Sequence, residues 1–150
     1  MQELNFPSYS FRIKTSENKT VIFDIVRKKY VVLTPEEWVR QHIIHFLHIE
    51  KEYPLSLMAV EKQVKVNSLS QRTDLVVYTA QGTPFLIVEC KAPFVEISQE
   101  TFNQIARYNR TLDAELLMVS NGLQHVYAIM DHTNKEYLFL KELPQFSVEG

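Results

Sequence analysis

Residues 85–93 read Phe85-Leu86-Ile87-Val88-Glu89-Cys90-Lys91-Ala92-Pro93, and this stretch decides the fold. Its first four residues are apolar on both faces, which is typical of a central strand that is covered on both sides. Pro93 cannot donate a ladder hydrogen bond and closes the strand. We therefore expect helices on both faces of the sheet that contains this strand.

The flanking sequence supplies two such helices. Thr34 is a suitable N-cap and Pro35 suits the first helical position, so a helix is predicted from residue 35 to about residue 50–53. A proline at position 54 ends it. Ser98 caps a second helix, which is predicted over residues 99–113.

Alternating or β-branched residues predict strands before, between and after these helices. The predicted strands cover residues 9–14, 21–25, 30–33, 58–66, 73–79, 85–88, 115–120, 124–130 and 136–140. Their order predicts an α/β (α+β) fold in which helices flank a mixed sheet. We expect a single domain, with a β-hairpin or meander over residues 1–33, a core over 34–131, and a strand and tail over 132–150.

The composition excludes several classes of protein. The 150 residues carry 16 Lys and Arg against 18 Asp and Glu, a net charge of −2, so the chain does not coat nucleic acid by bulk charge. A hydrophobic fraction of 45% excludes wholesale disorder, and the lone Cys90 excludes an intramolecular disulfide. The longest apolar stretches are too short to cross a membrane, and residues 1–10 do not resemble a signal peptide, so we expect a cytoplasmic protein.

Three charged residues stand at the ends of the apolar strands. Glu89 and Lys91 are two residues apart, so they share one strand face while Cys90 points away. If the strand of Asp74 pairs with this one, the two carboxylates converge, and their repulsion requires a cation. Mg²⁺ or Mn²⁺ suits oxygen ligands from Asp74, Glu89 and the main-chain carbonyl of Cys90. Lys91 would then orient or deprotonate a water, or stabilise charge on a phosphate. The alternative is a solvated salt bridge.

A second candidate pair lies on the second helix. Gln104 and Tyr108 are four residues apart, so they share one helix face. An amide and a phenol placed in this way can position a water or contact a phosphate oxygen. Such pairs also arise by chance, and this one gains weight from following the Glu89-Cys90-Lys91 strand directly.

Taken together, these motifs resemble the PD-(D/E)xK nuclease signature with a helix-borne Q-x3-Y extension. More closely, residues 27–128 resemble the N-terminal nuclease domain of type I restriction enzyme R subunits. The motifs that carry this resemblance are Thr34-Pro35-Glu36-Glu37 with Val39-Arg40-Gln41, Arg72-x-Asp74, Val88-Glu89-Cys90-Lys91-Ala92-Pro93, Gln104-x3-Tyr108 and Asn121-Gly122.

The resemblance implies a restriction-endonuclease-like core with a four-stranded mixed sheet and Mg²⁺-dependent hydrolysis of DNA. It implies that Asp74 and Glu89 are metal ligands, that Lys91 is the catalytic lysine, and that Gln104 and Tyr108 line the site. Such nucleases often add an acid from the first helix. Glu37 is the best match and Glu36 the alternative, although Glu37 also suits a capping box.

Two departures from the family pattern are visible. Thr73 replaces the proline before the first acid, and the sequence has no nucleotide-binding G-x-x-x-x-G-K-[ST] run, so it lacks a motor of its own. We therefore expect a stand-alone nuclease, a subunit that serves separate restriction-system subunits, or a relic. A homodimer would supply two sites for cutting both DNA strands. The rival functions are a non-catalytic DNA- or protein-binding module and a plain scaffold.

Two further clusters of side chains are less specific. His42, His45 and His48 recur every three residues, which spreads them around the helix and favours a solvated flank over a metal site. The cluster Arg27-Lys28-Lys29 is either a solvated turn or a phosphate contact beside the site, together with Arg72, Arg107 and Arg110.

Overall fold

A six-stranded mixed sheet dominates the fold of this computed structural model, which describes residues 1–66 and 69–147. The strand order is β4-β5-β6-β7-β8-β9, in which β6 and β7 are parallel and the other neighbours antiparallel. The strands are β4 (Met58–Val66), β5 (Leu69–Tyr78), β6 (Pro84–Cys90), β7 (Leu116–Ser120), β8 (His125–Asp131) and β9 (Glu136–Leu140). The predicted mixed sheet is confirmed, and it has six strands rather than four.

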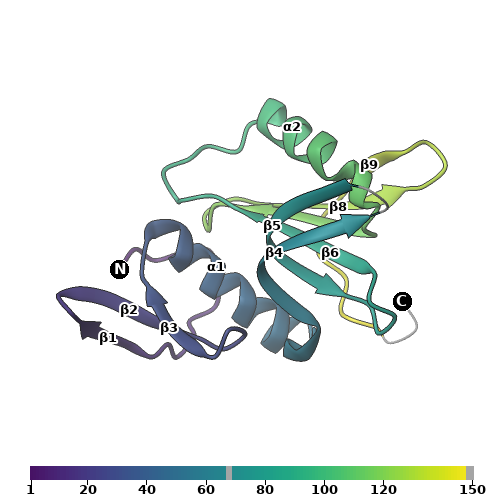
Figure 1. The fold of residues 1–150 in the computed structure, drawn as a ribbon. Coiled ribbons are helices and arrows are strands. Elements are labelled where there is room, and N and C mark those ends of the chain that lie inside the picture. Colours follow the sequence, from purple (N-terminus) through teal and green to yellow (C-terminus); the bar gives the residue numbers. More distant parts are fainter. Residues whose placement is uncertain (67–68, 148–150) are drawn as a thin grey trace.

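One helix packs on each face of this sheet (Figure 1). Helix α1 (Pro35–His45) continues as one π-helical segment (Phe46–Glu50), and α2 (Gln99–Asn109) continues as a short 3-10 turn (Arg110–Leu112). A further 3-10 turn (Leu55–Leu57) precedes β4. None of the helices in the described ranges is long and apolar enough to cross a membrane.

Alternate residues of β5 and β6 enter two separate cores, because successive side chains of a strand point to opposite faces. Val88 packs with the buried stripe of α1, which includes Val39 and Ile43. Ile87 packs with Ile105 on α2. The four apolar residues that precede Glu89 therefore form a strand covered on both sides, as the sequence predicts.

A separate three-stranded antiparallel sheet precedes α1, with the order β1 (Ile13–Ser16), β2 (Lys19–Asp24) and β3 (Lys29–Val32). The predicted meander is present, but its first strand begins later than the alternation from Tyr9 indicates. Tyr9 and Phe11 instead pack against the rings of His42 and His45 on α1. Contact with the helix outweighs the local two-residue period there.

Candidate functional site

Asp74 and Glu89 face each other across neighbouring strands. Leu75 pairs with Val88 in the antiparallel ladder of β5 and β6, so the next step along the register sets Asp74 opposite Glu89. The main-chain N–H of Cys90 donates a hydrogen bond of 2.7 Å to Oδ2 of Asp74. Both acids therefore lie at the end of an apolar sheet, on the face that α2 covers.

Lys91 lies beside this acid pair. Its Nζ is 3.8 Å from Oε1 of Glu89, and both side chains are partly buried. The main-chain N–H of Lys91 donates to the carbonyl of Ser120, which holds the residue at the edge of β7. Cys90 is 2% exposed and packs in the core on the α1 face, so the expected alternation of these three residues is present.

Burial and the mutual repulsion of Asp74 and Glu89 both disfavour the ionised form of Glu89. Burial raises the pKa of Glu89 to about 7, and the neighbouring charge of Asp74 adds to that rise. Lys91 opposes it. Glu89 is therefore poised to lose its proton near neutrality when a cation arrives.

A hollow of about 270 Å³ opens in front of Glu89. Gln104 and Tyr108 line it, together with Ile105 and Asn109 of the same helix. Glu89 of β6 and these residues of α2 therefore line one hollow, although at least 15 residues separate them in sequence. The two helix residues singled out from the sequence therefore line the same hollow as Glu89.

The acid of α1 that approaches this site is Glu36, not Glu37. Burial and the nearby charge of Asp74 raise the pKa of Glu36, whereas Arg40 and Lys91 lower it. Glu37 is 5% exposed, and Arg27, Arg40 and Gln41 donate hydrogen bonds to its two oxygens over distances of 2.7–3.0 Å. These hydrogen bonds favour Glu36 over Glu37 as the acid of α1 at the site, because both oxygens of Glu37 already accept from Arg27, Arg40 and Gln41.

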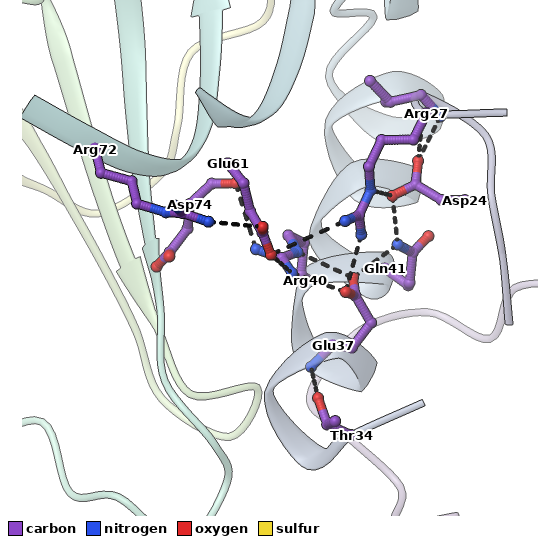
Figure 2. Close-up of polar contacts among 10 residues, drawn as sticks. Asp24, Arg27, Thr34, Glu37, Arg40, Gln41, Glu61, Arg72 and Asp74 are labelled. Carbon is purple, nitrogen blue, oxygen red and sulfur yellow. Dashed lines mark hydrogen bonds and ion pairs between the residues drawn. The ribbon is translucent and has the colours of Figure 1, made fainter. Parts of the chain in front are cut away.

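Glu37 belongs instead to a chain of ion pairs that joins β2, α1, β4 and β5 (Figure 2). The chain runs from Asp24 through Arg27, Glu37 and Arg40 to Glu61, and Glu61 also binds Arg72 at 2.8 Å. In Figure 2 the carboxylate of Asp74 points away from this cluster. We call these six residues, from Asp24 to Arg72, the ion-pair chain.

Arg40 connects the ion-pair chain to the candidate site. Its Nη1 lies 3.5 Å from the main-chain carbonyl of Asp74. Glu61 stands opposite Asp74 in the register of β4 and β5, but its φ of 52° is left-handed and its carboxylate binds Arg40 at 2.9 Å. The carboxylate of Glu61 therefore does not join those of Asp74 and Glu89. Arg40 also contacts the main chain of the strand that carries Asp74.

The loop after Lys91 is anchored by Asn121, which belongs to one of the motifs that carry the family resemblance. The side chain of Asn121 donates to the carbonyl of Val95 at 2.7 Å, and its oxygen accepts from the N–H groups of Leu123 and Gln124. Gly122 has a φ of +88°, which only glycine adopts without strain. The Asn121-Gly122 dipeptide predicts a turn, but it does not predict that the side chain of Asn121 binds the loop that contains Val95.

Two minor expectations need correction. His42 and His45 are 6% and 8% exposed, because the segment before β1 covers them, so they do not form a solvated flank. Arg27 is turned into the ion-pair chain, which leaves Lys28 and Lys29 as the exposed cations of their cluster.

The donor set at the candidate site fits a hard divalent cation. Asp74 and Glu89 offer carboxylate oxygens from opposite positions on neighbouring strands, and the carbonyl of Cys90 follows directly in the chain. In the described part of the chain no three His, Cys, Asp or Glu side chains are grouped for a metal. Mg²⁺ accommodates such a sparse set, because it keeps several waters and often uses only one or two carboxylates.

Comparison with known proteins bears on the same region. Residues 35–144 match a family model described as the N terminus of the type I restriction enzyme R protein. No curated protein matches the chain. A solved fragment of a putative HsdR subunit of a type I restriction enzyme from Vibrio vulnificus YJ016 is similar, with a TM-score of 0.51 and 19% identity over 75% of this chain. The match covers 24% of that longer chain, and at this identity it shows the fold alone. Because the family model spans most of the sequence and contains every residue of the candidate site, the chain belongs to the family of type I restriction enzyme R protein N termini.

Proposed function

We propose that this chain hydrolyses phosphodiester bonds of DNA with the help of Mg²⁺ or Mn²⁺. The observation that carries the proposal is the register that sets Asp74 opposite Glu89 at the end of an apolar sheet, with the ammonium group of Lys91 3.8 Å from Glu89. The family relation supports a nuclease-related function for the same residues.

In this proposal the acids and the lysine have distinct roles. Asp74 and Glu89, with the carbonyl of Cys90, would hold the cation, and Glu36 is the acid of α1 best placed to assist them. A bound Mg²⁺ would supply Lewis-acid polarisation of the phosphate. Lys91 would orient the attacking water or stabilise the charge that develops on the phosphate oxygens.

Gln104 and Tyr108 would contact the substrate or the water from the opposite wall of the hollow. Their amide and phenol groups can donate hydrogen bonds to phosphate oxygens. In hydrolysis the water oxygen forms a bond to phosphorus, the bond to the leaving oxygen breaks, and that oxygen takes up a proton. We propose separate subunits of a restriction system as partners, and a second copy of this chain where both strands are cut.

Plasmid cleavage tests the proposal. Wild-type protein should nick or linearise plasmid in Mg²⁺ or Mn²⁺, whereas Asp74→Ala and Lys91→Ala should each lose at least about 100-fold in rate. Asp113→Asn and Lys141→Ala, which change exposed residues, are the matched controls and should cleave as the wild type does. Unchanged cleavage by both site variants would reject the assignment.

A second candidate is a binding module that keeps the nuclease fold without catalysis. The observation in its favour is that the described residues group no three ligating side chains. It predicts salt-dependent duplex binding, no cleavage in either metal, and no stoichiometric heat on titration with Mn²⁺.

A further inference from the structure

The segment that contains the three-stranded sheet β1–β3 has a net positive charge, unlike the molecule as a whole. Residues 11–33 contain six Lys and Arg and two Asp and Glu, a net charge of +4, while the whole chain has −2. The rest of the sequence therefore carries −6. This sheet precedes residue 35, where the family match begins. Its charge is thus a feature of this chain beyond the matched region.

Three of these six cations lie on one face of the sheet. Arg12, Lys14 and Lys19 share that face with Phe23 and Tyr30, as the strand register requires. The opposite face carries Asp24, which is buried and accepts a hydrogen bond from Gln41 of α1. The side chains of Arg12, Lys14 and Lys19 therefore point away from α1, and all three residues are exposed. We call these three residues the basic face.

Aromatic rings hold two of these cations in place. The guanidinium carbon of Arg12 lies 4.2 Å from the centroid of the Phe23 ring, and Nζ of Lys14 lies 4.1 Å from that of Tyr30. Among the residues that the structure describes, neither these two cations nor Lys19 takes part in an ion pair. Their charge is available to an external anion.

A run of ion pairs links the turn after β2 to the candidate site. Arg27, which follows β2, starts the run of ion pairs through Glu37 and Arg40 that ends at the main chain of Asp74. Figure 1 shows β1–β3 and the loop after β6 projecting from the same side of the six-stranded sheet. A ligand bound along β1–β3 would thus lie on the side of the sheet from which this loop projects.

We propose that the basic face binds the phosphate backbone of a DNA duplex and holds it beside the candidate site. A regularly charged polyanion is the partner that a row of cations, two of them stacked on aromatic rings, would recognise. The inference rests on the proposed function, because it names the surface that brings the substrate to the acids. It also explains how a chain with a net negative charge would bind DNA.

The test is binding of a fluorescently labelled duplex by the full chain in EDTA, followed by anisotropy across a salt titration. The triple variant R12Q/K14Q/K19Q should bind at least about tenfold more weakly at about 50 mM salt, and its slope of log K against log salt should be shallower by about 3. The control K65Q/K135Q/K141Q removes the same charge from exposed positions elsewhere and should retain wild-type affinity and slope. Thermal unfolding of both variants checks that each is folded.

Equal duplex binding by the triple variant and the control would overturn the inference, as would the absence of duplex binding by the wild type. Binding to anionic phospholipid vesicles without binding to DNA would also overturn it. Titration with Mn²⁺ separates this inference from the proposed function. Loss of duplex binding in the triple variant supports the basic face even if the wild type binds no metal. Metal-dependent cleavage with unchanged duplex binding keeps the proposed function and rejects the basic face.

Discussion

Burial in the candidate site changes the protonation of Glu89. Burial, and then the charge of Asp74, raise the pKa of Glu89 to about 7 in the metal-free protein, well above its value in an unfolded chain. A carboxyl with a raised pKa stabilises the folded state fully below its unfolded pKa, and that contribution is lost as pH rises through the folded value. The metal-free protein should therefore lose stability between about pH 5 and about pH 8, by at most about 3 kcal/mol.

Urea unfolding in EDTA at those two pH values measures this loss. Glu89→Gln removes the titrating group, so its unfolding free energy should vary less with pH and should exceed that of the wild type at the higher pH. The same pH dependence in both proteins would show that Glu89 does not carry the effect.

Glu36 and Glu37 are neighbours in sequence with opposite expected behaviour. Glu36 is exposed and lies in the field of Asp74 and Lys91, so Glu36→Gln should change the unfolding free energy by less than about 0.5 kcal/mol but weaken Mn²⁺ binding and cleavage severalfold. Glu37 is buried between two arginines, so Glu37→Gln should cost about 3–5 kcal/mol of stability. Denaturant unfolding and Mn²⁺ titration of the two variants distinguish them, and the reverse pattern would contradict the placement.

At the scale of elements, Arg40 joins α1 to β4 and β5 through charged contacts. Its side chain is 6% exposed and binds Glu37 and Glu61, so Arg40→Ala leaves buried charge without a partner. We expect a loss of about 3–5 kcal/mol in the unfolding free energy. Arg72→Ala is the matched control, because the side chain of Arg72 is 66% exposed and its pair with Glu61 should contribute no more than about 1 kcal/mol. Similar losses in both variants would mean that Arg40 has no special structural role.

The elements themselves could be predicted because their signals are local. Thr34 caps α1 by accepting a hydrogen bond from the N–H of Glu37, and the apolar run before Glu89 forms a buried central strand. The pairing of Asp74 with Glu89 follows from the short connection between their strands. These features need only neighbours in sequence or one hairpin.

What the sequence could not predict depends on distant contacts. His42 and His45 are buried by the segment that contains Tyr9, some 30 residues earlier in the chain. The choice between Glu36 and Glu37 depends on the rotation of α1 against the sheet, since neighbouring helix residues point about 100° apart. The left-handed backbone of Glu61 and the contact of its carboxylate with Arg40 could not be predicted, because Arg40 is distant in sequence and the residues around Glu61 carry no signal of it.

At the scale of the whole molecule, charge is divided between two regions. The acids of the candidate site lie at one end of the six-stranded sheet, and the basic face lies on the separate sheet before α1. The ion-pair chain connects the two. We expect the basic face to attract the substrate and the candidate site to hydrolyse it. A substitution in one region should therefore leave the function of the other region intact.

Calorimetric titration of the full chain with Mn²⁺ tests the central claim most directly. If Asp74 and Glu89 together hold a cation, the wild type and Asp113→Asn should each give a stoichiometric heat. Asp74→Asn should lose that heat, because the substitution removes one of the two carboxylates that make the site. The same heat in wild type and Asp74→Asn, or no heat in the wild type, would contradict that claim.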